Sequence, residues 1–423
     1  AYHRVEYHGK DNIPKDGTVI YAPNHTNTLM DALAILIIDK QAKVFVARAD
    51  VFKHPTLLKI LTFLKMLPIN RRRDGIESLA KNEEITAVVV DVLHDKIPFC
   101  ILPEGTHRAK HGLLPLQKGI FRIALQANAS FGEEIPVYIV PVGIEYGHFF
   151  RYRSSLLLQI GSPINITQFV KDHPDWDTPE QINYLRDDLS DQLKKLLLNV
   201  SDESNYDAMI ELCLLCGDKQ QRIPNLRKNK LLDRFTTAKQ TLQEADSLLK
   251  SNPQDMQNLL QSTGDFARKR HALHIGLPSV LNTHLRSSLA LKTILLLLGL
   301  PCFVGAFIAN LPITGLSVWM CSKFKDRAFH NTLRYLISFL LFPVLMLVAG
   351  LTVGLTCSWI VGIIAAFLVF FSFFFLHEYL RLLRRFMSDL KWLVNRGLRK
   401  QFGIIRQEWK NISQKSDKTE TAS

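Results

Sequence analysis

The strongest constraint on this chain is a pair of long stretches without any charged residue in its C-terminal half. Residues 293–322 and 335–376 contain no Asp, Glu, Lys or Arg. The second stretch is about twice the ~20 residues that one helical membrane crossing requires. It therefore predicts two transmembrane helices, at about 335–353 and 357–376.

The first stretch, 293–322, is too short for two crossings and long for one. It is also interrupted by potential helix breakers, namely Gly299, Pro301, Asn310 and Pro312. Either one kinked span or a re-entrant hairpin fits. Lys and Arg flank every stretch, and short basic loops stay on the cytoplasmic side of a membrane. If all flanks obey this rule, the first stretch is re-entrant, turns near 303–310 and packs against the two transmembrane helices.

The N-terminal part, residues 1–170, alternates short β-rich runs with helical patterns. The β-rich runs are 18–22, 43–47, 97–102, 137–143 and 156–160, and the helical candidates are 29–39, 55–66, 76–95 and 115–130. This alternation predicts an α/β domain with a mostly parallel sheet flanked by helices. The 55–66 helix is amphipathic, and it fits either a core position or contact with a membrane.

Three further parts follow this domain. Residues 171–285 mix charged residues with helical apolar spacing and predict a helical insertion or linker without chemical motifs. Residues 286–376 hold the membrane segments. Residues 377–423 predict a basic amphipathic helix and a polar tail, since 377–412 carries nine Lys or Arg against three Asp or Glu. Such a helix beside membrane spans is expected on the anionic lipid surface; the alternative is a helix that packs on its own domain.

The net charge of +13 and the pI of about 9.4 indicate an anionic partner. An anionic membrane fits the uncharged stretches, whereas no motif that combines basic and aromatic residues indicates nucleic acid. Cys213 and Cys216 form an isolated C-x-x-C. Zinc binding or redox function is one interpretation, and two small apolar residues on a helix is the favoured one, so no metal site is expected. The first residue is Ala, which leaves open that an N-terminal segment precedes it.

His25 is the first candidate for chemistry. It follows the strand predicted at 18–22 and precedes an apolar helix predicted from residue 29, so it lies in a strand-to-helix turn, with Asp31 six residues later. A neutral histidine can remove a proton from a hydroxyl, and a carboxylate can fix its tautomer. Six residues apart in one helix, the two side chains point away from each other, so a contact requires His25 to lie before the helix. The alternative is a turn histidine and a helix carboxylate without chemistry.

Four sequence blocks then occur in the order typical of one family. They are Asn24 and His25 with Asp31, Pro-Ile-Asn-Arg at 68–71, Pro-Glu-Gly-Thr at 103–106 with Lys118 and Gly119, and Ile-Val-Pro-Val-Gly at 139–143. With these blocks, residues 5–170 resemble the glycerolipid acyltransferase superfamily of lysophosphatidate and glycerol-3-phosphate acyltransferases. Most members have four residues between the histidine and the aspartate. This chain has five, as in the HX5D branch that contains the fungal glycerol-3-phosphate acyltransferases.

The resemblance implies a membrane-bound enzyme that transfers a fatty acyl group from acyl-CoA or acyl-carrier protein to the hydroxyl of 1-acyl-sn-glycerol-3-phosphate or sn-glycerol-3-phosphate. His25 would be the general base and Asp31 its orienting partner. No cofactor beyond the thioester donor is implied, and the catalytic domain would face the cytoplasm. The alternatives are another lysophospholipid as acceptor, or a catalytically inactive lipid-binding protein. Acceptor, donor, chain length and oligomeric state stay open.

The resemblance also assigns the remaining site residues. Arg71, with Arg73 beside it, would bind the acceptor phosphate, and Glu104 would bind the acceptor, a surface-turn carboxylate being the alternative. Backbone N–H groups near Gly105 and Thr106 are candidates for the oxyanion site, because glycine permits unusual dihedral angles. The supporting residues would be Lys118 and Arg108 as further cations, Asn24 as a structural residue of the turn, and Pro141 in the pocket wall.

Overall fold

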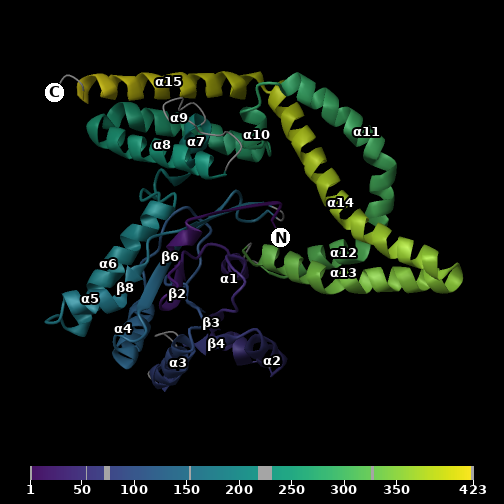
Figure 1. Ribbon diagram of the computed structural model, residues 1–423. Coiled ribbons are helices and arrows are strands. Elements are labelled where there is room, and N and C mark those ends of the chain that lie inside the picture. Colours follow the sequence, from purple (N-terminus) through teal and green to yellow (C-terminus); the bar gives the residue numbers. More distant parts are fainter. Residues whose placement is uncertain are drawn as a thin grey trace. The chain divides into compact units, whose positions relative to one another are not determined.

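The computed structural model describes residues 2–53, 55–70, 77–151, 154–217, 231–324 and 328–420 (Figure 1). It divides into two compact units, Ala1–Asn199 and Val200–Ser423. The first unit thus extends beyond residue 170, because the helices α5 (Ile166–Asp172) and α6 (Thr178–Leu196) belong to it. The two units are described separately below.

The first unit is built on a sheet with the strand order β1-β7-β6-β2-β5-β3-β4, and β8 pairs with β6. The strands are β1 Arg4–His8, β2 Thr18–Pro23, β3 Val44–Arg48, β4 Met66–Ile69, β5 Phe99–Cys100, β6 Val137–Tyr146, β7 Ser155–Ile160 and β8 Ile164–Asn165. Among these strands, the antiparallel pairings are those of β6 with β7 and of β6 with β8. The predicted mostly parallel sheet is therefore confirmed.

Helices cover both faces of this sheet. They are α1 Leu29–Leu36, α2 Pro55–Phe63, α3 Glu77–His94, α4 Gly119–Phe131, α5 Ile166–Asp172 and α6 Thr178–Leu196. Side chains alternate between the faces along a strand, so Ile20 and Ala22 of β2 join the core cluster beneath α3, α4 and α6. Val19 and Tyr21 join the cluster beneath α1. Because both faces are covered, all residues of β2 and β6 are buried, and the side chains of their connecting loops gather at the sheet edge.

The second unit begins with a helical bundle, as expected for an insertion without strands. Its helices are α7 Tyr206–Cys216, α8 Leu231–Ser251, α9 Pro253–Ala272, α10 Leu277–Val280 and, from the end of the chain, α15 Arg396–Glu420. Cys213 and Cys216 are both buried on α7, as small apolar residues. Among the residues that the structure describes, no group of His, Cys, Asp and Glu is suited to a metal ion.

The expected membrane-surface role of the C-terminal amphipathic helix is wrong for α15. Its apolar residues Leu398, Ile405 and Trp409 are buried, and α15 packs against α7, α8 and α9. Gln401 adds a hydrogen bond to the carbonyl of Ser262 on α9, 3.1 Å long. For α15 the alternative, a helix that packs on its own domain, is therefore the correct one, whereas residues 377–394 of the predicted amphipathic helix belong to the preceding helix, Trp359–Val394. α15 also continues to Glu420, where a polar tail was expected.

Four apolar helices complete this unit: α11 Leu285–Ala309, α12 Leu311–Ser322, α13 Ala328–Thr356 and α14 Trp359–Val394. Three of them, α11, α13 and α14, are long and apolar enough to cross a membrane. The two helices predicted in the second uncharged stretch are thus present, and α14 continues well beyond it. A 12-residue helix such as α12 is about 18 Å long, too short for a crossing.

The first uncharged stretch breaks at Asn310, between α11 and α12. Asn310 is buried, and its amide donates to the hydroxyl of Ser372 on α14 over 2.9 Å. α11 packs along α14, and α12 packs along α13 (Figure 1). The predicted packing of this stretch against the other two helices is confirmed, whereas its re-entrant topology stays a prediction.

Candidate active site

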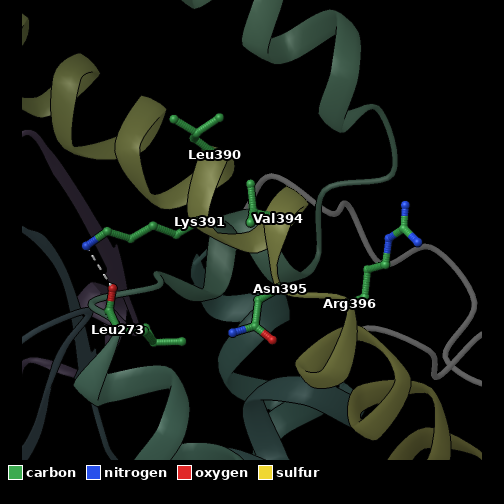
Figure 2. A pocket seen from close by; sticks show the side chains of 6 residues that line it. All are labelled: Leu273, Leu390, Lys391, Val394, Asn395 and Arg396. Carbon is green, nitrogen blue, oxygen red and sulfur yellow. Dashed lines mark hydrogen bonds between the residues drawn. The ribbon is translucent and has the colours of Figure 1, made fainter.

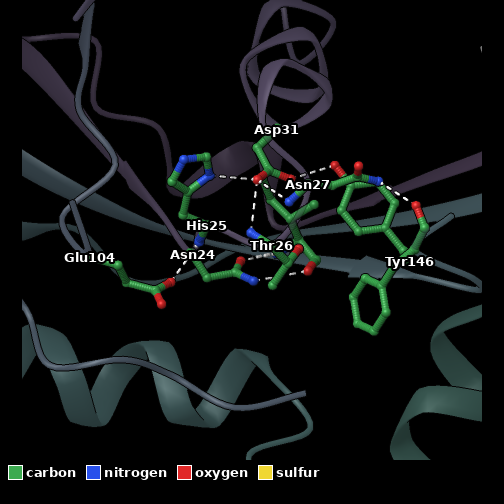
Figure 3. Close-up of polar contacts among 9 residues, drawn as sticks. Asn24, His25, Thr26, Asn27, Asp31, Glu104 and Tyr146 are labelled. Carbon is green, nitrogen blue, oxygen red and sulfur yellow. Dashed lines mark hydrogen bonds and ion pairs between the residues drawn. The ribbon is translucent and has the colours of Figure 1, made fainter. Parts of the chain in front are cut away.

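His25 lies in the turn between β2 and α1, before the helix begins at Leu29. Its Nδ1 is 2.8 Å from Oδ2 of Asp31, which lies in the first turn of α1 (Figure 3). The contact expected from the sequence is therefore present, for the expected geometric reason. A carboxylate at this distance favours the tautomer with the proton on Nδ1. That tautomer leaves Nε2 as the basic atom of the ring.

Asp31 organises the whole turn, and it is fully buried. Its Oδ2 also accepts the backbone N–H groups of Thr26 and Asn27, at 2.8 and 2.7 Å. Its Oδ1 accepts the hydroxyl of Tyr146, at the end of β6, at 2.6 Å. A buried carboxylate is tolerated only when hydrogen bonds replace its hydration, and these four donors do so. The imidazole of His25 is thus held by a partner that is itself fixed from several sides.

Glu104 lies in the loop between β5 and α4, and it is 3% exposed. The surface-turn interpretation of this residue is therefore wrong. Its Oε1 accepts the backbone N–H of His25 at 2.6 Å, and its Oε2 accepts that of Leu114 at 3.0 Å. Burial raises the pKa of Glu104 to about 7, although these two hydrogen bonds act in the opposite direction. In this structure, Glu104 ties the histidine turn to the β5–α4 loop.

The same loop contains the residues expected to bind an oxyanion. Gly105 has a φ of +66°, which confirms the expected unusual dihedral angle. However, its N–H donates to the carbonyl of Leu102 at 3.2 Å, so this group serves the turn itself. Thr106 is exposed. The N–H of Arg108 donates to the carbonyl of His25 at 3.2 Å, which brings Arg108 next to the turn.

Asn24 is a structural residue of the turn, as expected, but it hydrogen-bonds backbone groups of a strand instead of groups of the turn itself. Its amide donates to the carbonyl of Ile144 at 3.2 Å and accepts the N–H of the same residue at 2.7 Å, which fixes the turn to β6. Pro141 lies inside β6, opposite Ala22 in the register. Lys118 is exposed at the N-terminus of α4. Arg71 and Arg73 lie outside the described residues.

Sequence reasoning missed Tyr146 and two histidines near the turn. The ring centroid of His107 is 5.6 Å from that of His25. His111 has its Nδ1 2.9 Å from Oε2 of Glu145, the residue before Tyr146. Both histidines closely follow the 103–106 block, and this position in the sequence is the feature that could have identified them as site residues. Tyr146 lies more than a hundred residues from Asp31, so only the parallel pairing of β2 with β6 brings them together.

With this geometry in place, comparison with known proteins gives a consistent result. Residues 4–145 match the protein-family model described as Acyltransferase. Glycerol-3-phosphate O-acyltransferase 2 of Saccharomyces cerevisiae is 31% identical over 137 residues, which cover 30% of this chain and 17% of the yeast protein. A 1-acyl-sn-glycerol-3-phosphate acyltransferase of Cocos nucifera is 28% identical over 165 residues, or 39% of this chain and 49% of that protein.

Among solved structures, the 1-acyl-sn-glycerophosphate acyltransferase PlsC of Thermotoga maritima aligns with a TM-score of 0.32 and 21% identity, over 45% of this chain and 70% of that one. The chain spans less than half the length of the yeast and coconut relatives. The family match covers the strands and loops that build the His25–Asp31 turn and the Glu104 loop. The N-terminal domain therefore matches the acyltransferase family over residues 4–145 and is similar in sequence to glycerol-3-phosphate and 1-acyl-sn-glycerol-3-phosphate acyltransferases.

Proposed function

We propose that this protein is a membrane-bound O-acyltransferase that moves a fatty acyl group from an acyl thioester to the hydroxyl of 1-acyl-sn-glycerol-3-phosphate or sn-glycerol-3-phosphate. The observation that carries this proposal is the 2.8 Å contact between His25 and the buried carboxylate of Asp31. It lies within the region that matches the acyltransferase family. The names of the yeast and coconut relatives support these two acceptors.

The reaction follows from the histidine tautomer. Nε2 of His25 takes the proton of the acceptor hydroxyl while the oxygen attacks the thioester carbonyl. The carbon–sulfur bond of the tetrahedral intermediate then breaks, and the imidazolium returns the proton to the departing thiolate. Asp31 stabilises the imidazolium between these two steps. The new ester and the free thiol balance the reaction, and no acyl-enzyme is required.

The phosphate of the acceptor requires fixed cations, for which arginine is suited by its bidentate donors. Family resemblance assigns this role to Arg71, with Arg73 beside it. Lys118 and Arg108 are the supporting cations in the proposal. Glu104 acts chiefly as a positioning residue, because both of its oxygens already accept backbone N–H groups of the site loops.

A lipid acceptor must reach the enzyme from a membrane, and two features of the chain would hold the enzyme at that membrane. Besides the three long apolar helices, α2 of the first unit exposes Leu58 and Phe63 to 45 and 85%, and Leu64 directly after it is 54% exposed. Burial of such side chains in lipid is favourable. This exposure favours the membrane-contacting role of α2 over the core position. In the proposal, the catalytic domain lies on the cytoplasmic side, where thioester donors occur.

A substrate panel with the purified full-length protein tests the proposal. Labelled glycerol-3-phosphate, its 1-acyl form and other lysophospholipids are offered with long-chain acyl-CoA or with acyl-carrier protein. Thiol release and the identity of the product lipid are then measured. We expect a phosphatidate or lysophosphatidate product with thiol release at the same rate. Absence of thiol release with both donors, alongside intact lipid binding, would instead support the catalytically inactive lipid-binding protein.

A further inference from the structure

Residues 196–199, the last four of the first unit, pack along one face of the buried strand β6. Gly143 of β6 permits this packing, because a Cβ at that position would lie 2.6 Å from the carbonyl oxygen of Leu196. Two residues farther along the strand, Oε1 of Glu145 accepts the N–H of Leu198 at 2.8 Å. Alternate residues of a strand face the same side, so both contacts lie on one face. The glycine of the fourth sequence block thus makes room for the 196–199 segment.

The 196–199 segment holds the β5–α4 loop at two points. Oδ1 of Asn199 accepts the N–H of Leu113 at 2.9 Å. Glu145 provides the second point, because its Oε1 binds Leu198 while its Oε2 is 2.9 Å from Nδ1 of His111. Glu145 is 9% exposed, and the side chain of His111 is 16% exposed. Water therefore replaces these contacts poorly, and their loss is costly for the loop.

The first of these points is connected to His25 through Glu104. The N–H of Leu114, the residue after Leu113, donates to Oε2 of Glu104 at 3.0 Å. Oε1 of Glu104 accepts the N–H of His25 at 2.6 Å (Figure 3). The adjacent N–H groups of residues 113 and 114 are thus held by Asn199 and by Glu104. A displacement of the loop at Asn199 would be transmitted to the backbone of His25.

The second point is connected to Asp31 through Phe149. The rings of His111 and Phe149 pack with their centroids 4.9 Å apart. The carbonyl of Phe149 accepts the side-chain amide of Asn27 at 2.8 Å, and the N–H of Asn27 donates to Oδ2 of Asp31 at 2.7 Å. The 196–199 segment is therefore linked to both His25 and Asp31 through contiguous contacts.

We propose that the 196–199 segment positions the β5–α4 loop for acyl transfer, with Glu145 and Asn199 as positioning residues. The described hydrogen bonds of these two side chains go to the loop and to the segment, so both residues act through others. A misplacement of about 1 Å can cost a reaction up to ~10²-fold in rate. The inference rests on the proposed function, because it concerns the same site. Asn199 is also the last residue of the first unit, so the chain continues into the second unit from the residue that holds the loop.

The first test compares Asn199→Ala with a matched asparagine variant. Asn199→Ala should lower kcat roughly three- to tenfold with little change in KM for the thioester donor, because the loop is displaced while the donor contacts are kept. Asn199→Asp retains an acceptor oxygen and should restore kcat. Asn165→Ala is the control, since Asn165 also accepts a backbone N–H over 2.9 Å, that of Gln168 at the start of α5. It should lower the thermal midpoint and keep the kcat per folded molecule.

A second pair of variants tests the other point of attachment. Glu145→Ala removes the acceptor of the Leu198 N–H and the partner of His111, so it should lower kcat at least as much as Asn199→Ala. Glu145→Gln can still accept the N–H of Leu198 and can donate to His111. It should therefore keep most of the kcat that Glu145→Ala loses. Equal kcat values for the folded alanine and glutamine variants would contradict the role of Glu145.

A hollow of about 450 Å³ in the second unit supplies a control away from this loop (Figure 2). It is lined by Leu273, Leu390, Lys391, Val394, Asn395 and Arg396. Lys391 points to the carbonyl of Leu273, at the end of α9, and donates to it over 3.1 Å. Lys391→Ala thus also removes a hydrogen bond between a side chain and the backbone of another element. None of these lining residues belongs to the proposed site.

Amide hydrogen exchange of the full-length protein measures the position of the loop independently of activity. Peptides that cover 103–114 and 24–27 should exchange faster in Asn199→Ala, and they should keep the wild-type rate in Asn165→Ala and Lys391→Ala. In an active enzyme, unchanged exchange of these peptides in Asn199→Ala, or equal kcat values for Asn199→Ala and Asn165→Ala, would overturn this proposal alone. A wild type that releases no thiol with either donor would overturn the proposed function, and this proposal with it.

Discussion

At the scale of single residues, the site depends on how Asp31 is held. The hydroxyl of Tyr146 donates to Oδ1 of Asp31, while Oδ2 accepts the imidazole and two backbone groups. Removing this hydroxyl leaves a buried carboxylate oxygen without its donor, at a cost of about 1–3 kcal/mol. The rigidity of the His25–Asp31 pair, here called the dyad, thus depends on a residue of a different strand, β6.

Tyr146→Phe should therefore lower kcat several-fold and lower the thermal unfolding midpoint, with little effect on KM for the thioester donor. Tyr138→Phe is a matched control, because Tyr138 is also on β6 and its hydroxyl donates to Asp16, in the turn before β2, instead of to Asp31. Steady-state kinetics of both variants check this expectation. A Tyr146→Phe enzyme with the kcat of the wild type would show that Asp31 needs no support from β6.

Glu104 predicts a pH dependence of stability. Burial raises the pKa of Glu104 from its ordinary value of 4.5 to about 7 in the folded protein. The folded state therefore binds this proton more tightly than the unfolded chain, and the associated stability is lost as the pH rises from about 5 to 8. The thermal midpoint should fall over this range. In Glu104→Gln it should be lower at pH 5, because one acceptor is lost, but should fall less steeply. Parallel slopes for the two proteins would contradict this assignment.

Only part of the site could be predicted from the sequence. The His25–Asp31 contact was predictable, because both partners lie in one short segment whose strand and helix signals fix the turn. The contacts of Glu104 and Tyr146 were not predictable, because they depend on which strands become neighbours in the sheet. The burial of Glu104 contradicts the usual exposure of carboxylates, and only its two backbone donors explain it.

At the scale of elements, the β5–α4 loop depends on a glycine in the left-handed region. Gly105 adopts a φ of +66°, and a Cβ there would lie 3.1 Å from the side chain of Gln117. Gly105→Ala should therefore destabilise the loop by about 1–2 kcal/mol and lower activity by displacing Glu104. Gly132→Ala is the control for backbone strain, because Gly132 has a φ of +58° with nothing within 4 Å of its Cβ position.

Activity per folded molecule, measured beside the thermal midpoint, separates the two variants. Both should lose stability, and only Gly105→Ala should lose turnover beyond that loss. If the two variants retain equal activity, the shape of the β5–α4 loop does not position the site.

The central elements of the first unit could be predicted because they are buried on both faces and rich in β-branched residues, as in β2 and β6. The strands β1, β4 and β8 were missed. Residues of β1 are half-buried at the sheet edge and include charged side chains. Its pairing with β7 connects segments about 150 residues apart. Such a strand is defined by its neighbour rather than by its own composition.

At the scale of the whole molecule, the sequence distinguished the α/β domain from the apolar helices, and it misjudged α15. Amphipathic periodicity shows that a helix has an apolar face without showing what covers that face. Here α7, α8 and α9 cover it. The topology of the apolar helices is likewise open to test, because length and composition qualify α11 as a span, whereas the basic flanks favour a re-entrant segment.

Cysteine accessibility decides between these topologies. Lys323→Cys, in a background without other cysteines, places a thiol at an exposed position after α12, whereas Asn331, in the first turn of α13, is only 4% exposed. The re-entrant topology predicts that an impermeant reagent labels this thiol only after the cells are lysed, as for Lys15→Cys in the first unit. Labelling of Lys323→Cys in sealed cells, with Lys15→Cys protected, would establish a single span through α11.

The account as a whole rests on His25 as the general base of an acyl transfer. The most direct measurement compares the rate of acylated-lipid formation, and of thiol release, between the wild type and His25→Ala with the best acceptor of the substrate panel. A positioned general base typically contributes 10²–10⁴-fold, so we expect a loss of that order in a protein that still folds, with a thermal midpoint lowered no more than in Tyr146→Phe because Oδ2 of Asp31 keeps two backbone donors. A folded His25→Ala protein that forms product at nearly the rate of the wild type would contradict the account.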